Sequence, residues 1–273
     1  MLLGIDIGGS TIHLGLVKGT EIVKKTSHPS FNKGASLEET ISYLKTLISD
    51  ILTPEVTSIG IGVPSLVDTK KGIVYDACNI PSWKEVHLKE EIEAAFGVPV
   101  EVNNDANCYT LGAFARLGGE YSSITCVTLG TGTGMGIVLD GHLYEGAHCG
   151  AGEIGSLAYR GVDFESFCSK KFFTDHGVSP REVSDGVEMG NPAAKALMDE
   201  FGTHLGELMA VVMYTYDPDC IVLGGGIANC FPYFEPAMRK TLGERYIYPR
   251  FLESIKIVPM PEDDTPLLGA SLL

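Results

Sequence analysis

Apolar residues along the chain follow two alternating patterns. Short apolar runs, typical of buried strands, occupy residues 2–7, 58–63, 99–102, 124–129, 220–223 and 255–258. Stretches that predict helices occupy residues 37–51, 87–96, 163–176, 192–216 and 266–273. Strands and helices that alternate in this way predict an α/β fold in which neighbouring strands pair in parallel.

The first strand leads into a glycine-rich turn, Gly8-Gly9-Ser10-Thr11, after which a second apolar strand follows. Glycines at a turn let backbone N–H groups approach an anion, and the two hydroxyl groups add further donors. Asp6 precedes the turn and would repel a phosphate unless a divalent cation such as Mg²⁺ stood between them. The stretch therefore predicts a nucleotide-phosphate turn, and an ordinary hairpin with an acidic residue is the alternative.

The same pattern returns in a second hairpin over residues 124–139. Its turn consists of Gly130, Thr131, Gly132 and Thr133. A third glycine cluster, which contains Gly225 and Gly226, follows the apolar run at 220–223. Two such hairpins, far apart in the sequence, predict a duplicated domain with a nucleotide held between the two halves.

Asp105 lies in a polar segment between the strand at 99–102 and a helix that runs to Leu117. Open α/β sheets bind ligands at such strand-to-helix junctions. An Asp at the start of a helix is commonly an N-cap, which is one interpretation. The other is a base that orients a substrate hydroxyl and accepts its proton late in phosphoryl transfer. In that case Asn104 would hydrogen-bond to neighbouring hydroxyls.

The composition fits a globular protein with two domains of ordinary size, since the chain has 273 residues. A net charge of −15 argues against nucleic-acid or anionic-membrane binding as the main function. The seven cysteines include no C-x-x-C pair, which predicts reduced thiols and a cytoplasmic protein. The uncharged run at 121–139 is rich in glycine and threonine, which favours a soluble hairpin over a membrane span.

Several common site motifs are absent or incomplete. The chain contains no Gly-Lys pair and so no Walker A loop, and it contains neither H-E-x-x-H nor G-x-S-x-G. Residues 150–155 match G-x-G-x-x-G, but no clear strand precedes them, so we reject a dinucleotide site. Glu153 within this loop is either a solvent-facing charge or a functional carboxylate. His148, Cys149 and Cys168 lack the spacing of a zinc site.

Seven motifs follow one another along nearly the whole chain. They read LGIDIGGS at 3–10, GIGVP at 60–64, NIPSW at 79–83, VNNDAN at 102–107, TLGTGTGMG at 128–136, GEIG at 152–155 and VLGGGI at 222–227. In this order they resemble the ROK family of sugar kinases and repressors, within the actin/hexokinase/Hsp70 fold.

The resemblance implies a duplicated, ribonuclease H-like α/β fold of two domains with a cleft between them. The N-terminal domain would comprise residues 1–118 and be joined by a C-terminal helix at 265–273, and the second domain would comprise 119–264. The implied activity is ATP-dependent phosphorylation of a hexose or hexose derivative at its 6-hydroxyl. ATP and Mg²⁺ are the implied cofactors, with sugar and ATP as small-molecule ligands, no nucleic acid or membrane partner, and a homodimer as assembly.

The resemblance also assigns roles to single residues. Asp105 matches the catalytic base, and the two hairpin turns would hold the phosphates, with Mg²⁺ carried near Asp6. Gly225 and Gly226 would lie near the adenosine. The positions that match sugar-binding residues are Asn79, Asn104, Asp105, Glu153 and Glu165.

The chain departs from the family pattern at Ser10-Thr11, where the family commonly has Thr-Lys, and at one loop. Ser156 stands where most members carry a His that serves both zinc and sugar, and the cysteine-rich zinc cluster is missing, so no zinc is expected. The loss leaves a non-catalytic sugar or nucleotide sensor as an alternative, together with a kinase or ATPase of the same fold that acts on another substrate. Family repressors begin with a helix-turn-helix, whereas this sequence begins at the first strand, so DNA binding is not expected.

Overall fold

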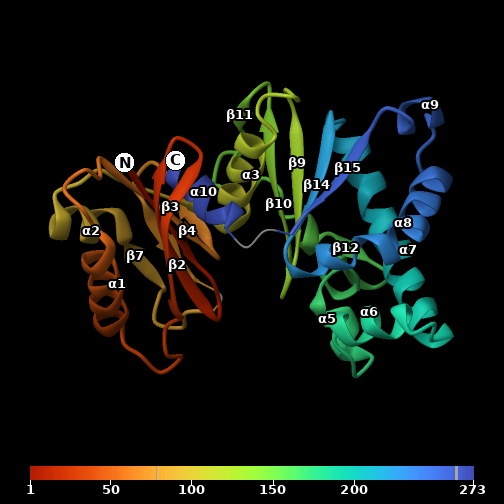
Figure 1. Cartoon of the computed structure of the whole chain (residues 1–273), viewed down its shortest axis with the longest axis horizontal. Helices are drawn as coiled ribbons and strands as arrows, with labels where there is room; N and C mark the ends of the chain where they lie inside the picture. The colour runs from red at the N-terminus through yellow and green to blue at the C-terminus, as the bar shows by residue number, and fades with distance from the viewer. Residues whose placement is uncertain (78, 262–263) are drawn as a thin grey trace.

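The computed structural model describes residues 1–77, 79–261 and 264–273, and its framework is a pair of five-stranded sheets (Figure 1). The strands of the first sheet are β1 (Leu2–Ile7), β2 (Thr11–Lys18), β3 (Glu21–Pro29), β4 (Ser58–Val63) and β8 (Val100–Asn104). Their order is β3-β2-β1-β4-β8. β1 is antiparallel to β2 and parallel to β4, and β4 is parallel to β8.

The second sheet repeats this arrangement. Its strands are β9 (Ile124–Leu129), β10 (Thr133–Leu139), β11 (His142–Leu143), β14 (Cys220–Gly224) and β15 (Lys256–Met260). Their order is β11-β10-β9-β14-β15, with β9 antiparallel to β10 and parallel to β14. The same five-stranded topology thus occurs twice, which confirms the expected duplicated α/β fold.

Two helices cover the outer face of the first sheet, and both begin and end where the sequence predicts. In α1 (Leu37–Ile51), Ser36 forms a capping box with Glu39: the Ser36 hydroxyl accepts from Glu39 N at 3.2 Å, and the Glu39 carboxylate accepts from Ser36 N at 2.7 Å. α2 (Leu88–Phe96) ends at Gly97, which has a φ of 66°. A small sheet precedes α2 and consists of β5 (Leu66–Asp68), β6 (Ile73–Tyr75) and β7 (Glu85–His87).

The helices α3 (Asp105–Arg116) and α10 (Thr265–Ser271) lie between the two sheets (Figure 1). α10 packs on the first sheet so closely that a Cβ on Gly60 would lie 1.7 Å from the Ala270 carbonyl oxygen. The opposite side of α3 packs against the second sheet through Tyr109 and Ala113. The chain therefore returns at α10 to the sheet with which it began.

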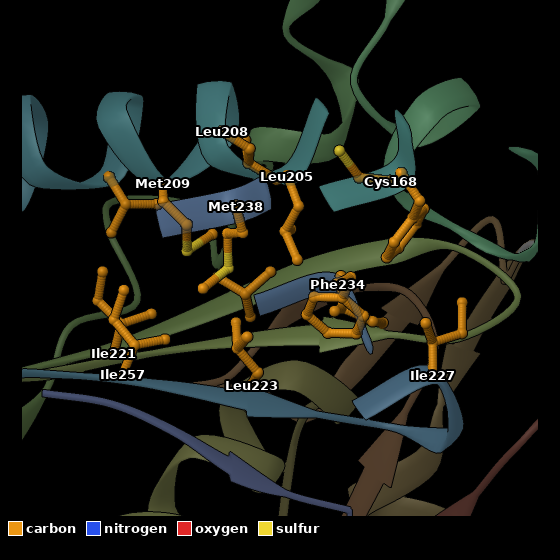
Figure 2. Packing of buried hydrophobic residues seen from close by; sticks show 14 of the residues in the cluster. Cys168, Leu205, Leu208, Met209, Ile221, Leu223, Ile227, Phe234, Met238 and Ile257 are labelled. Atoms are coloured by element: carbon orange, nitrogen blue, oxygen red, sulfur yellow. The ribbon is translucent and has the colours of Figure 1, made fainter. Parts of the chain in front are cut away.

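The second sheet is covered on its far face by α7 (Pro192–Tyr216) and α8 (Phe231–Arg245), which form the largest apolar core. Figure 2 shows Leu205 and Met209 of α7 above Leu223 of β14. Two glycines of α7 allow α8 to approach, because a Cβ on Gly202 would lie 2.4 Å from the Phe234 carbonyl oxygen.

Three features of the second half differ from the expectation. The helix predicted at 163–176 is divided into β13 (Val162–Asp163), α4 (Glu165–Cys168) and α5 (Lys170–Asp175), because Ser169 adopts an extended backbone and caps α5. The helices α6 (Pro180–Glu188) and α8 were not predicted. α8 carries a proline within it, Pro236, and has no clear apolar face, which hides it from pattern analysis.

In the described part of the chain, no helix is long and apolar enough to cross a membrane. The six cysteines that the structure describes are all buried and form no disulfide. Cys78 lies outside the described residues.

Candidate active site

Two carboxylates approach each other at the carboxyl ends of the parallel strands of the first sheet. Asp6 of β1 is paired in register with Gly62 of β4, and Gly62 is paired with Asn103 of β8. Gly62 carries no side chain, and a Cβ there would lie 3.1 Å from the Cys108 sulfur of α3. This row of the sheet therefore faces the start of α3, where Asp105 lies.

The N-cap of α3 is Asn104, not Asp105. Asn104 Oδ1 accepts hydrogen bonds from the backbone N–H groups of Ala106 at 2.9 Å and Asn107 at 3.3 Å. Its Nδ2 donates to the Ser65 carbonyl at 3.2 Å. Asp105 is the first residue of the helix, and its carboxylate accepts from Ala106 N at 2.9 Å. Capping therefore does not account for Asp105, which leaves its carboxylate available for another role.

Burial makes both carboxylates weak acids. It raises the pKa of Asp6 to about 7, helped by the charge of Asp105 and opposed by Lys25. Burial also raises the pKa of Asp105 to about 6, to which the charge of Glu153 adds, while hydrogen bonds from the backbone at Ala106 act in the opposite direction. A carboxylate that titrates near neutral pH suits proton transfer, and a pair of them suits a bound cation.

The first glycine turn is held in place from two sides. Gly8 N donates to the Thr11 carbonyl at 2.9 Å, and the Ser30 hydroxyl donates to the Gly8 carbonyl at 2.7 Å. A Cβ on Gly9 would lie 3.2 Å from Asn79 Nδ2, so the Asn79 side chain lies against the turn. The structure thus places Asn79 beside the first predicted phosphate turn.

The second glycine turn is contacted by Glu165, a residue expected to bind sugar. Glu165 Oε2 accepts a hydrogen bond from Thr133 N at 3.0 Å. The same oxygen would lie 2.5 Å from a Cβ on Gly132, so the glycine makes room for it. The backbone of this turn therefore already binds one anionic oxygen, a contact that no local sequence pattern predicts.

Two further hydrogen bonds attach the α4–α5 segment to this turn. The Thr133 hydroxyl donates to the Cys168 carbonyl at 3.0 Å. Lys170 N donates to the Gly130 carbonyl at 2.8 Å. Together with the Glu165 contact, these bonds hold the turn at both of its ends. The break in the predicted helix is the segment that makes these contacts.

The loop that carries Glu153 lies directly on the backbone of β10. A Cβ on Gly152, which has a φ of 97°, would lie 2.0 Å from the Met135 carbonyl oxygen, and one on Gly155 would lie 2.3 Å from that of Thr133. Glu153 lies between these two contacts. The Glu153 residue is exposed, but partial desolvation of its carboxyl group and the charge of Glu165 raise its pKa, which places the two acidic groups near each other. Ser156 follows in a single 3₁₀ turn (Ile154–Ser156) and is exposed.

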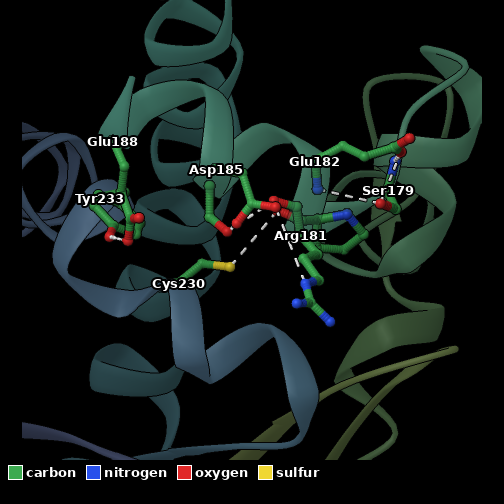
Figure 3. Close-up of polar contacts among 9 residues, drawn as sticks. Ser179, Arg181, Glu182, Asp185, Glu188, Cys230 and Tyr233 are labelled. Carbon is green, nitrogen blue, oxygen red and sulfur yellow. Dashed lines mark hydrogen bonds and ion pairs between the residues drawn. The ribbon is translucent and has the colours of Figure 1, made fainter. Parts of the chain in front are cut away.

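The third glycine cluster meets the second turn at a cavity of about 510 Å³. Gly225 has a φ of 78°, and a Cβ there would lie 2.5 Å from the Leu129 carbonyl oxygen, at the end of β9. The cavity is lined by Gly130, Thr131, Lys170, Gly226 and residues of α6 and α8 that include Arg181, Asp185, Glu188 and Tyr233. Figure 3 shows the Tyr233 hydroxyl donating to Glu188, at 2.5 Å. This wall of the cavity was not predicted from the sequence, because neither α6 nor α8 was predicted.

A buried polar network joins the two halves behind the carboxylates. Asn107 Nδ2 donates to Asn103 Oδ1 at 3.0 Å, and Asn103 Nδ2 donates to Glu145 in the loop after β11. The Cys149 thiol, from the same loop, donates to Asn103 Oδ1 at 3.4 Å. Cys149 therefore has a packing and hydrogen-bonding role at the start of α3.

The two sheets share one topology, and several carboxylates lie near the two glycine turns. These features define a protein of the actin/hexokinase class. The sequence model of the ROK family matches residues 2–273, and the chain belongs to the ROK family.

Known proteins similar to this chain include both kinases and a repressor. The glucokinase of Thermotoga maritima is 25% identical, with 99% of this chain and 96% of the glucokinase covered. The xylose repressor of Bacillus spizizenii is 27% identical, with 98% of this chain and 75% of the repressor covered. The structure of a ROK family glucokinase from Streptomyces griseus, in complex with glucose and AMPPNP, has a TM-score of 0.81 at 23% identity, with 99% and 97% covered. The similarity to this structure supports a shared fold and nothing more.

Proposed function

We propose that the protein is an ATP-dependent hexose kinase that transfers the γ-phosphoryl group to the 6-hydroxyl of its sugar. The observation that carries this proposal is the Asp105 carboxylate, which is half-buried at the start of α3 while the neighbouring Asn104 caps the helix. Kinase relatives, and the neighbouring structure with glucose and AMPPNP, support the choice of substrates.

Asp105 acts as the catalytic base in this proposal. An alcohol is far too weak an acid to lose its proton before phosphoryl transfer begins, so the carboxylate first orients the hydroxyl and then takes the proton late. Its pKa of about 6 leaves it ionised at neutral pH yet able to hold a proton.

The two glycine turns supply backbone N–H groups to the phosphates, with Gly225 and Gly226 beside the nucleoside. Asp6 fits a role beside a magnesium ion carried by the nucleotide, because its half-buried carboxyl group is close enough to Asp105 for that charge to raise its pKa, while Lys25 acts in the opposite direction. Mg²⁺ would neutralise charge on the transferring phosphoryl group. Among the described residues no group of three or more His, Cys, Asp or Glu is arranged to hold a metal ion.

Asn79, Asn104, Glu153 and Glu165 would contact the sugar hydroxyls. Glu153 and Glu165 raise the negative charge of this region, and the pKa of Glu153 reflects it. Two carboxylates favour neutral hydroxyl groups and repel an anionic substrate. The site therefore suits an uncharged hexose or an N-acetylated hexosamine. We also propose that residues 1–118 with 265–273 form one domain and 119–264 the other, which close on the substrates.

ADP release over a panel of hexoses and N-acetylhexosamines, with Mg²⁺ and ATP, tests this function. We expect turnover on one or a few sugars. Asp105→Asn should lower kcat by roughly 10²–10⁴-fold, the range that a general base contributes. Nucleotide affinity of the variant, measured by calorimetry, is the control for an intact site. Near-normal turnover in Asp105→Asn would contradict the assignment of the base.

A non-catalytic sugar sensor is the second candidate. It is favoured by the similarity to a xylose repressor and by Ser156, which stands where the resemblance leads one to expect a His. Tight sugar binding by calorimetry, without ADP release on the same sugar, would support the sensor and overturn the kinase.

A further inference from the structure

The cavity beside the second glycine turn contains a lysine to which the proposed reaction assigns no role. Lys170 lines this cavity together with Gly130, Thr131 and Gly226. We infer that the Lys170 ammonium group binds the polyphosphate chain of the nucleotide. This inference rests on the proposed function and adds to it a binding residue from the α4–α5 segment.

The backbone of Lys170 is fixed relative to the turn. Its N–H donates to the Gly130 carbonyl at 2.8 Å. The preceding residue, Ser169, is fully buried, and its hydroxyl accepts from Lys171 N at 3.1 Å. The Lys170 side chain therefore starts from a defined point next to Gly130, and only its flexible end has to move to reach a ligand.

The charge of Lys170 is not neutralised by a neighbour. Within the described ranges Lys170 forms no ion pair, whereas Lys171 binds Asp175 at 2.5 Å. The other cation of the cavity, Arg181, lies 4.0 Å from Asp185 (Figure 3). In a chain with a net charge of −15, an unpaired cation at a glycine turn provides local attraction for an anion.

The backbone of the turn already donates to one anionic oxygen, since Thr133 N donates to the Glu165 carboxylate at 3.0 Å. Lys170 lies at the other end of the same turn, on the side of the cavity. A compact, strongly hydrated ammonium group matches phosphate oxygens better than it matches a sugar hydroxyl or a base. The combination of turn N–H groups and one ammonium group points to a phosphate chain as the ligand of this end.

Calorimetric titration with AMPPNP and Mg²⁺, and separately with adenosine, tests the inference on the whole protein. Lys170→Gln removes the charge with little change in size, and Lys170→Arg keeps it. Lys171→Gln is the matched control, because this adjacent lysine is paired with Asp175. We expect Lys170→Gln to weaken AMPPNP binding roughly tenfold at low salt and to leave adenosine binding unchanged. Lys170→Arg should retain most of the affinity, and Lys171→Gln should behave as wild type.

The outcomes separate this inference from the proposed function. Unchanged AMPPNP affinity in Lys170→Gln, with turnover intact in the wild type, would overturn the role of Lys170 and leave the kinase standing. An equal loss of AMPPNP and adenosine affinity would show that Lys170 only supports the shape of the cavity, and would also overturn it. Absence of AMPPNP binding to the wild type would overturn both proposals.

Discussion

The role proposed for Asp105 would cost the protein stability. Its carboxyl group is half-buried, and desolvation raises its pKa from 3.8 to about 6. The ionised form, which a base requires, is therefore the form that the folded protein tolerates least. Asp6 lies two strands away in the first sheet, and its ionisation also lowers stability because its pKa is raised to about 7.

The consequence can be measured as a dependence of stability on pH. The folded state binds the Asp105 proton more tightly than the unfolded chain does, so ionisation costs the wild type stability as the pH rises from about 4 to about 6. Asp105→Asn carries no such charge and can still accept the Ala106 hydrogen bond. We expect the variant to be more stable than the wild type above pH 6, on the order of 2 kcal/mol.

Urea unfolding of both proteins without ligands, at pH 4 and pH 8, checks this expectation. The two proteins should differ little at the lower pH and diverge at the higher one. A constant difference at both pH values would mean that the effect is not electrostatic.

At the scale of elements, a small hairpin supports the α4–α5 segment. β12 (Ala158–Tyr159) and β13 (Val162–Asp163) pair antiparallel. Tyr159 stacks on Phe164 with ring centroids 4.2 Å apart, and its hydroxyl is 2.9 Å from His204 Nδ1 in α7. Glu165, which contacts the second turn, follows Phe164 directly. The hairpin thus anchors the segment to the core of the second half.

Substitutions of Tyr159 should separate the contributions of its ring and its hydroxyl. Tyr159→Phe removes one hydrogen bond and should lower the free energy of unfolding by about 1 kcal/mol. Tyr159→Ala also removes the stacked ring and should cost about 3 kcal/mol. Denaturant unfolding of both variants gives these values. Equal losses in the two variants would mean that the ring contacts contribute nothing.

The elements also show what sequence can reveal. Both hairpins, the capping box at Ser36 and the C-terminal helix follow from apolar periodicity, glycine and capping residues, which are local signals. The break at Ser169 and the contact between Glu165 and Thr133 depend on the Gly130 turn docking from elsewhere in the chain, so no local pattern contains them. The cavity wall is a different case. Pro236 conceals α8, whereas α6 begins with a capping box at Ser179 and Glu182, a local signal that could have predicted it.

At the scale of the whole molecule, the two sheets are connected through a close packing of backbones around α10. A Cβ on Gly60 would lie 1.7 Å from the Ala270 carbonyl oxygen, and one on Gly269 would lie 1.6 Å from that of Cys108 in α3. These glycines let α10 touch both the first sheet and α3. Backbone contacts of this kind cannot be relieved by a side-chain rotation.

Gly60→Ala should therefore destabilise the protein by about 3 kcal/mol, since the helix or the strand has to shift. Gly243→Ala is the matched control: Gly243 lies in α8 with no atom within 4 Å of its built Cβ, and alanine should stabilise the helix by about 0.5–1 kcal/mol. Thermal unfolding of both variants distinguishes them. Similar melting temperatures for the two would contradict the close packing of α10.

The position of α10 has a consequence for synthesis on the ribosome. β1 and β4 emerge early, but the helix that covers their inner face is made only after the whole second half. Until then the early sheet carries an apolar, glycine-lined face open to water, which attracts chaperones and proteases. A ribosome that stalls after the second sheet would release a polypeptide in which the inner face of the first sheet is not yet covered by α10. The first sheet thus receives the helix on its inner face only after every strand of the second sheet has been made.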